Sequence, residues 1–167
     1  MKRSSLRIFF NVFLIVVMIS FILYAKEKGK IGTTKKNGEG CDCHGDASSK
    51  VTVVIDGPSE LKPNETADYT ITISGGPMKT GGTNIAVSSG MLIEGEGLRY
   101  KGGELTHTMP QAFKDGKIVF NFKYTAPETA GEVTIFANGN STNNDETKKG
   151  DAWNYAPNKV VTIIASN

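Results

Sequence analysis

The feature that most constrains the fold is a series of short apolar alternations between residues 51 and 164, separated by turn-forming residues. Along 69–73 and 118–122 an apolar side chain occupies every second position, which is the period of a strand with one buried face. Turn signals recur at intervals of roughly 8–12 residues, as they do in sandwiches and barrels. The sequence therefore predicts an all-β domain built as a two-sheet sandwich. The expected strands are 51–55, 67–73, 84–88, 117–124, 132–137 and 159–164.

Residues 1–25 have the layout of an export signal. Lys2, Arg3 and Arg7 precede an uncharged run over 8–25, whose length is near the lower limit of roughly 17–25 residues for a spanning helix. Of the last three residues only Ala25 is small, which is a poor match to a signal-peptidase site. We therefore expect the run to stay as a membrane anchor, with cleavage as the alternative.

The rest of the chain divides into two parts. Residues 26–50 are rich in Lys, Gly, Thr and Asp, and this composition predicts a mobile tether that cannot form a core. Residues 51–167 are the right length for one domain with a core of its own. The formal net charge is only +2 and the lysines are scattered among acids, so no nucleic-acid surface is expected.

The tether contains the chemistry-bearing cluster Cys41-Asp42-Cys43-His44. Two thiolates and an imidazole are ligands that suit Zn or Cu. A strained disulfide between Cys41 and Cys43, or two idle thiols, is the alternative. The sequence has two histidines, and His107 is the second. If the cluster folds back over the sandwich, His107 supplies a further ligand to a centre on His44; otherwise it hydrogen-bonds within its own loop.

Several motifs within 41–164 together resemble a Reeler-type sandwich, in the exported bacterial form called a choice-of-anchor domain. The motifs are Ile55-Asp56-Gly57-Pro58, Gly82-Thr83-Asn84-Ile85-Ala86, Leu105-Thr106-His107-Thr108 and Gly150-Asp151-Ala152-Trp153-Asn154. The resemblance implies a sandwich outside the cytoplasm, so that the chain is exported and its C-terminal part faces the periplasm or the cell exterior.

Bacterial relatives in that family often carry Cys-x-x-Cys-His before the sandwich, which resembles a c-type haem attachment motif. The resemblance implies a haem c bound through Cys41 and Cys43, with His44 as one axial ligand. If the cluster folds back over the sandwich, His107 is the candidate for the other axial ligand, because it is the second of the two histidines in the sequence. Here the motif is one residue shorter, because a single residue separates the two cysteines. A Zn or Cu ion held by the same four residues is the alternative cofactor.

The function expected from the sequence is an extracytoplasmic, membrane-tethered electron-transfer module that carries one haem or metal centre and acts with a redox partner protein. The alternative is a surface adhesion or interaction domain whose cysteine cluster is structural. No enzyme is expected, because with two histidines a Ser-His-Asp arrangement would have to be built on His107. Two weaker candidates remain: the oxygen-rich loop 138–145 with Asp151 for Ca²⁺, and Trp153 with Tyr155 as a glycan-stacking surface. For these a solvated loop and a covering for the sandwich edge are favoured.

Overall fold

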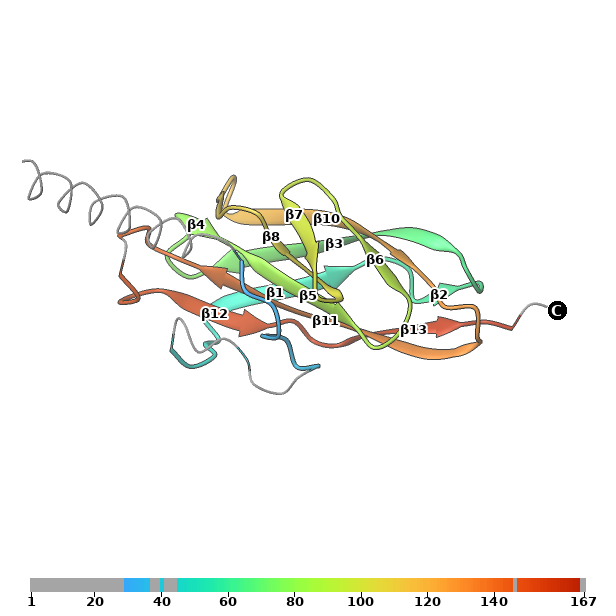
Figure 1. Ribbon diagram of the computed structural model, residues 1–167. Helices are drawn as coiled ribbons and strands as arrows, with labels where there is room; N and C mark the ends of the chain where they lie inside the picture. Colours follow the sequence, from blue (N-terminus) through green and yellow to red (C-terminus); the bar gives the residue numbers. More distant parts are fainter. Residues whose placement is uncertain (1–28, 37–39, 41–44, 146, 166–167) are drawn as a thin grey trace, which may run out of the picture.

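The computed structural model describes residues 29–36, 40, 45–145 and 147–165, and within these ranges the regular elements are all β-strands. They form two packed sheets and a small two-stranded ribbon (Figure 1). The predicted all-β sandwich is therefore confirmed. None of the described residues belongs to a helix long and apolar enough to cross a membrane.

The first sheet has four antiparallel strands in the order β1-β3-β10-β6. Their bounds are Val51–Asp56 for β1, Thr66–Gly75 for β3, Lys117–Thr125 for β10 and Met91–Ile93 for β6. Ile73 lies opposite Val53 and Ile118, and all three are buried. The next row, Val54, Thr72 and Val119, faces outward, as the strand period requires. The alternation in the sequence thus sets which face of this sheet forms the core.

The second sheet follows the order β2-β13-β11-β5-β8-β7, with β12 also paired to β11. The bounds are Glu60–Leu61 for β2, Lys159–Ile163 for β13, Gly131–Ser141 for β11, Thr83–Val87 for β5, Glu104–His107 for β8, Leu98–Lys101 for β7 and Ala152–Tyr155 for β12. The pair β2 and β13 is parallel and the others are antiparallel. The ribbon joins β4, Thr80–Gly81, to β9, Gln111–Ala112.

The core between the sheets is centred on four aromatic residues, Tyr69, Phe120, Phe122 and Tyr124, all buried. The rings of Tyr69 and Phe122 stack with centroids 5.7 Å apart. The phenol of Tyr69 donates to Pro58 O at 2.8 Å and that of Tyr124 to Ser89 O at 3.0 Å. Each large ring therefore adds buried apolar area without leaving its polar atom unpaired.

The sandwich has two distinct ends. We call the end with the ribbon the β4 end. The end of β3, the start of β10 and the end of β11 lie there, because Lys117 pairs with Ser74 and Gly76 packs on Ser141. Thr125 and Met91 lie at the opposite end. The end of β13 also lies at that opposite end, where Ile163 pairs with Gly131 at the start of β11 (Figure 1).

Four strands of the second sheet were not among those predicted, namely β2, β7, β8 and β12. β8 is short and carries Glu104 and Thr106, polar residues that mask a strand period, yet both are buried. Pairing with β5 on one side and β7 on the other recruits them into the sheet.

The described part of segment 26–50 differs from the tether that its composition predicted. Thr33 and Thr34 are 3% and 0% exposed, so residues 29–36 are packed against the sandwich. We call these eight residues the strap. The prediction overlooked that hydrogen bonds, without apolar side chains, can hold a segment in place when its partners are buried too.

Candidate functional site

The strap crosses the outer face of the second sheet at right angles to its strands. Strand pairing aligns Arg99, Thr106, Asn84, Asn138 and Tyr155 in one row over β7, β8, β5, β11 and β12. Four spacings between neighbouring strands amount to about 19 Å. The chain from residue 29 to residue 35 spans about 20 Å when extended. The strap bends at residues 31, 32 and 34, and the long side chain of Lys35 reaches the last member of the row.

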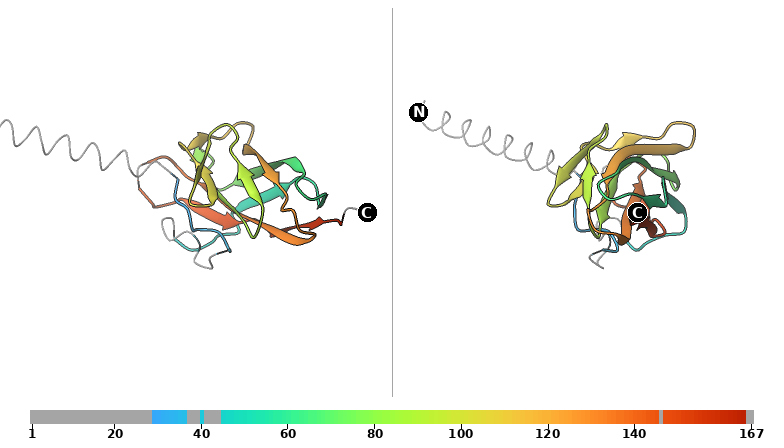
Figure 2. Two further views of the ribbon diagram at one scale, coloured as in Figure 1. Left: turned by 45° about the vertical axis from the view of Figure 1, so that its right-hand side comes forward. Right: turned by 90° about the vertical axis from the view of Figure 1, so that its right-hand side faces the viewer.

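The strap contacts this row in chain order. Arg99 Nη2 donates to Gly29 O at 3.0 Å, and Thr106 Oγ1 donates to Lys30 O at 3.2 Å. At the other end the Lys35 ammonium lies 5.1 Å from the centroid of the Tyr155 ring, within the range of a cation–π contact. Figure 2 shows the strap as a blue segment along the outside of the sandwich.

The centre of the strap is held by two asparagines. Asn84 Oδ1 accepts from Thr33 N at 3.1 Å and from Thr33 Oγ1 at 2.9 Å. Asn138 Nδ2 donates to Thr33 O at 2.7 Å and to Thr33 Oγ1 at 2.9 Å. The hydroxyl thus donates to one asparagine and accepts from the other. We call Thr33, Asn84 and Asn138 the clasp.

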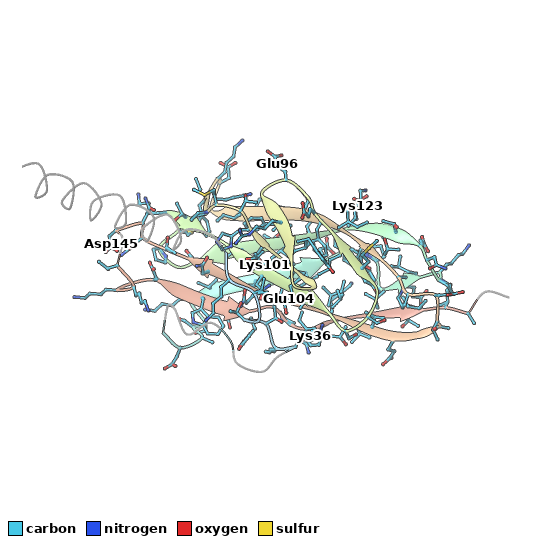
Figure 3. All side chains as sticks on the ribbon, in the orientation of Figure 1. Lys36, Glu96, Lys101, Glu104, Lys123 and Asp145 are labelled. Carbon is cyan, nitrogen blue, oxygen red and sulfur yellow. The ribbon has the colours of Figure 1, made fainter. Side chains whose placement is uncertain are left out.

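A second layer of hydrogen bonds fixes the clasp. Asn84 Nδ2 donates to Glu104 Oε2 at 2.9 Å and to Leu105 O at 3.0 Å, which orients its amide. Asn138 Oδ1 accepts from Asn84 N at 3.1 Å. Glu104 Oε2 also accepts from Gly32 N at 2.8 Å, so the carboxylate holds both the strap and the clasp. Figure 3 labels Glu104 near the middle of this face.

Sequence reasoning missed the clasp, although one signal for it was present. Asparagine is depleted in strands, yet Asn84 begins a predicted strand and Asn138 directly follows another. Such residues need hydrogen-bond partners when they are buried. The partner, Thr33, is 105 positions from Asn138, which no local pattern reveals.

Cys41, Cys43 and His44 lie outside the described residues, but the residues that flank them are placed. Trp153 Nε1 donates to Gly45 O at 2.6 Å. Gly40, at φ +64°, lies so close to Trp153 and Tyr155 that a Cβ would overlap both rings. Both flanks of the segment 41–44 therefore contact the same indole ring.

Trp153 and Tyr155 themselves are adjacent on the outer face of β12. Their ring centroids are 5.0 Å apart at an interplanar angle of 79°. Trp153 is buried, and its carbonyl accepts from Ser48 N at 2.8 Å. The pair therefore lies against Gly40, and Trp153 also holds Gly45 and Ser48. The edge-covering role and the glycan-stacking alternative stay predictions.

His107 lies at the end of β8, against the start of β5. Its Nδ1 is 3.1 Å from Thr83 N and 3.2 Å from Thr83 O, so it has a partner at Thr83 in either tautomer. The ring packs so closely on Gly82 that a Cβ there would overlap it. The carbonyl of His107 accepts from Gly29 N at 3.2 Å.

The described residues do not bring His107 next to Gly40 or Gly45. Those glycines contact β12, which is separated from β8 by β11 and β5. Three strand spacings correspond to about 14 Å. A centre shared by His44 and His107 stays a prediction, because His44 lies outside the described residues.

The oxygen-rich loop after β11 bonds largely to itself. Asn143 N donates to Asp151 Oδ1 at 3.0 Å, and Asp145 Oδ1 accepts from Thr147 N and Thr147 Oγ1 at 2.9 Å each. These bonds from Thr147 to the carboxylate lower the pKa of Asp145. Within the ranges that the structure describes, no three His, Cys, Asp or Glu side chains are grouped as a metal site.

No protein-family model matches the chain, and no curated protein matches it. Among solved structures, it is similar to the CARDB domain of a Pyrococcus furiosus protein in complex with di-metal ions, at 20% identity and TM-score 0.41, covering 70% of this chain and 94% of that one. A solution structure of that domain gives 22% identity, TM-score 0.43 and coverages of 70% and 96%. The PKD domain of an M14-like peptidase from a Thermoplasmatales archaeon gives 13% identity, TM-score 0.43 and coverages of 68% and 94%. At these TM-scores the likeness assigns neither a family nor a function, and the fold class rests on the sheets themselves.

Proposed function

We propose that this β-sandwich is exported and membrane-tethered, and that it carries one electron-transfer centre on Cys41, Cys43 and His44. The centre is a c-type haem or a copper ion. The observation that carries the proposal is the contact of both flanking glycines, Gly40 and Gly45, with the ring of Trp153.

The contact matters because binding sites work best when their ligands stand on a rigid support. Trp153 belongs to a strand of the second sheet, and its indole N–H is used to hold Gly45. Gly40 and Gly45, the residues on either side of 41–44, are thereby both held at the same ring. Two thiols and an imidazole in so short a span are a ligand set for a soft metal ion, or the attachment and axial groups of a haem.

His107 has a defined role to test in this proposal. In the tautomer whose Nδ1–H donates to Thr83 O, Nε2 carries no proton, as a metal-binding imidazole nitrogen must. In the other tautomer Nδ1 accepts from Thr83 N. Whether it completes the centre is decided by His107→Ala. That change should alter the visible spectrum or the metal affinity if His107 is a ligand, and leave both unchanged if it only packs on Gly82.

The test of the centre is production of the full chain in a host that matures c-type haem. We expect one haem, or one copper ion, per chain, with a spectrum that changes on reduction. The matched control replaces Cys41 and Cys43 with Ser and should contain neither. A chain that holds neither haem nor copper at one per molecule, or only redox-inert zinc, would refute the electron-transfer function.

The tether is tested separately by intact mass and membrane fractionation. We expect a chain that retains residues 1–25 and stays with the membrane after washing with salt. A mature N-terminus near Lys26 would show that the leader is cleaved and would refute the anchor.

A surface interaction module is the second candidate, and the outer face of the first sheet favours it. Val54 and Val119, on either side of Thr72, are 46% and 38% exposed. Within the described part of the chain, these valines are exposed apolar side chains on the outer face of the first sheet, while the strap lies on the other sheet. Cells that display the chain should adhere to one another less when both valines are replaced by Asp; equal adhesion would remove this candidate.

A further inference from the structure

The strap places one end of the sandwich close to the membrane, if the run over 8–25 is embedded there as proposed above. Gly29 is fixed to the sandwich by bonds to His107 O and from Arg99 Nη2. Residues 26–28 alone separate it from the end of the apolar run. Four residue steps extend over at most about 14 Å. The point where the chain meets the sandwich therefore lies within that distance of the hydrocarbon boundary.

The part of the sandwich held there is its β4 end. The partner of Gly29, His107, packs on Gly82, and Gly82 directly follows β4. Gly82 also accepts from Asn140 N at 3.0 Å, close to the end of β11. The opposite end, with Met91, is farther away by about 26 Å, the length of β10 from Lys117 to Thr125.

The surface of the β4 end has a composition suited to lipid headgroups. Met78 and Met109 are 43% and 45% exposed, although their side chains are apolar. Met78 adjoins the exposed Lys79 in the chain, and Phe113 N donates to Lys79 O at 3.1 Å, which brings the exposed Lys114 close to Lys79. Met109 precedes β9 of the same ribbon. Further exposed lysines at this end are Lys117, Lys148 and Lys149, with Asp115 and Asp145 as exposed acids. Figure 3 shows Asp145 at the same end as β4.

We propose that the β4 end docks on the anionic lipid surface of the membrane that holds residues 8–25, with Met78 and Met109 inserted among the headgroups. Lysine chains place their ammonium groups at lipid phosphates while apolar side chains enter the interface. A link of three residues keeps the surface and the lipid at a high effective concentration, so weak contacts are enough. The sandwich then stands on the membrane with its far end outward. This orientation rests on the membrane tether of the proposed function.

The experiment places one tryptophan at either end of the full chain in vesicles that contain anionic, brominated lipid. In a Trp153→Phe background, Met109→Trp is compared with Met91→Trp. Met91 is the matched control because it is also an exposed methionine, at 54%, but lies at the opposite end. We expect loss of most of the fluorescence for Met109→Trp and none for Met91→Trp. Equal quenching of the two would overturn the docking.

A second measurement needs no substitution. Amide hydrogen exchange of the full chain is compared in vesicles with anionic lipid and in vesicles with zwitterionic lipid alone. We expect slower exchange over 77–82 and 108–116 with anionic lipid, and no change over 88–93. Replacing Lys79 and Lys114 with Glu should remove the difference, whereas Lys62→Glu at the opposite end should not.

Flotation separates failure of the docking from failure of the tether. A chain that floats with the vesicles but shows no end-specific quenching or protection refutes the docking and leaves the tether in place. A chain that does not float refutes the membrane tether and the docking with it.

Discussion

Replacing Asn138 with Ala tests whether the strap is a structural part of the domain. The substitution removes the bonds to Thr33 O and Thr33 Oγ1, and it removes the acceptor for Asn84 N. Thr33 O and Asn84 N lose these partners while Thr33 and Asn84 are buried. Each buried group left without a partner costs about 1–3 kcal/mol. With two such groups, the free energy of unfolding should fall by about 2–6 kcal/mol if the strap stays in place.

Detachment of the strap would reduce that cost. Water then reaches the groups that lost their partners, and the free energy of unfolding falls only by the amount that the bound strap contributed. Detachment leaves less surface to expose on unfolding, so the denaturant slope m should fall together with the midpoint. A fall in midpoint at constant m indicates instead that the strap stays bound over unsatisfied groups.

The assay is urea unfolding of a chain that begins at Lys26, with hydrogen exchange at Gly32 and Thr33 as a local readout. Asn121→Ala is the control, because Asn121 is an exposed asparagine on the outer face of β10 and its loss should change stability by no more than about 0.5 kcal/mol. If Asn138→Ala is no more destabilising than Asn121→Ala, the clasp does not hold the strap and the reasoning is wrong.

Three further outcomes are expected. A chain that begins at Ser49 should still unfold cooperatively, but with a lower urea midpoint than a chain that begins at Lys26. The shorter chain lacks the strap, and water hydrates the side-chain amides of Asn84 and Asn138 instead. Equal midpoints would contradict this. Gly82→Ala should lower the free energy of unfolding by about 1–3 kcal/mol, because the added Cβ overlaps the His107 ring. The displaced ring should change the chemical shifts of the His107 resonances in NMR spectra. Burial raises the pKa of Tyr69 and of Tyr124 from 10.0 to about 12. The fold thus favours the protonated phenols, so their stabilisation is complete below about pH 10 and is lost as the pH rises towards about 12. The urea midpoint should fall over that range, and less so in Tyr124→Phe.

The long strands of the first sheet were predictable from the sequence, because a strand that is buried on one face has an apolar residue at every second position. In β3 and β10 that period extends over most of the strand, and Ile71 and Phe120 fall on the buried face as expected. Turn residues mark the breaks between strands for an equally local reason, the backbone angles of glycine, asparagine and proline. Fold class therefore follows from patterns that each need only a few neighbouring residues.

The location of the candidate site could be predicted only in part. The sequence identified Cys41, Cys43 and His44 by their chemistry, and it named Trp153 and Tyr155 as a surface of interest. It did not predict that Gly40 and Gly45 meet on the Trp153 ring, because that contact joins residues more than a hundred positions apart. Nor did it show that β12, which carries this ring, is separated from His107 on β8 by two other strands.

The strap shows most clearly what the tertiary structure alone decided. Its residues are mainly glycine, lysine and threonine, a composition that predicts no burial because none of these side chains gains much from leaving water. Burial becomes favourable only when other elements supply complete hydrogen-bond partners at the right spacing, as Asn84, Asn138 and Glu104 do from three different strands. Apolar periodicity is a property of one segment and can be read from it. Polar complementarity is a property of a pair of surfaces, and it exists only once the fold has brought those surfaces together.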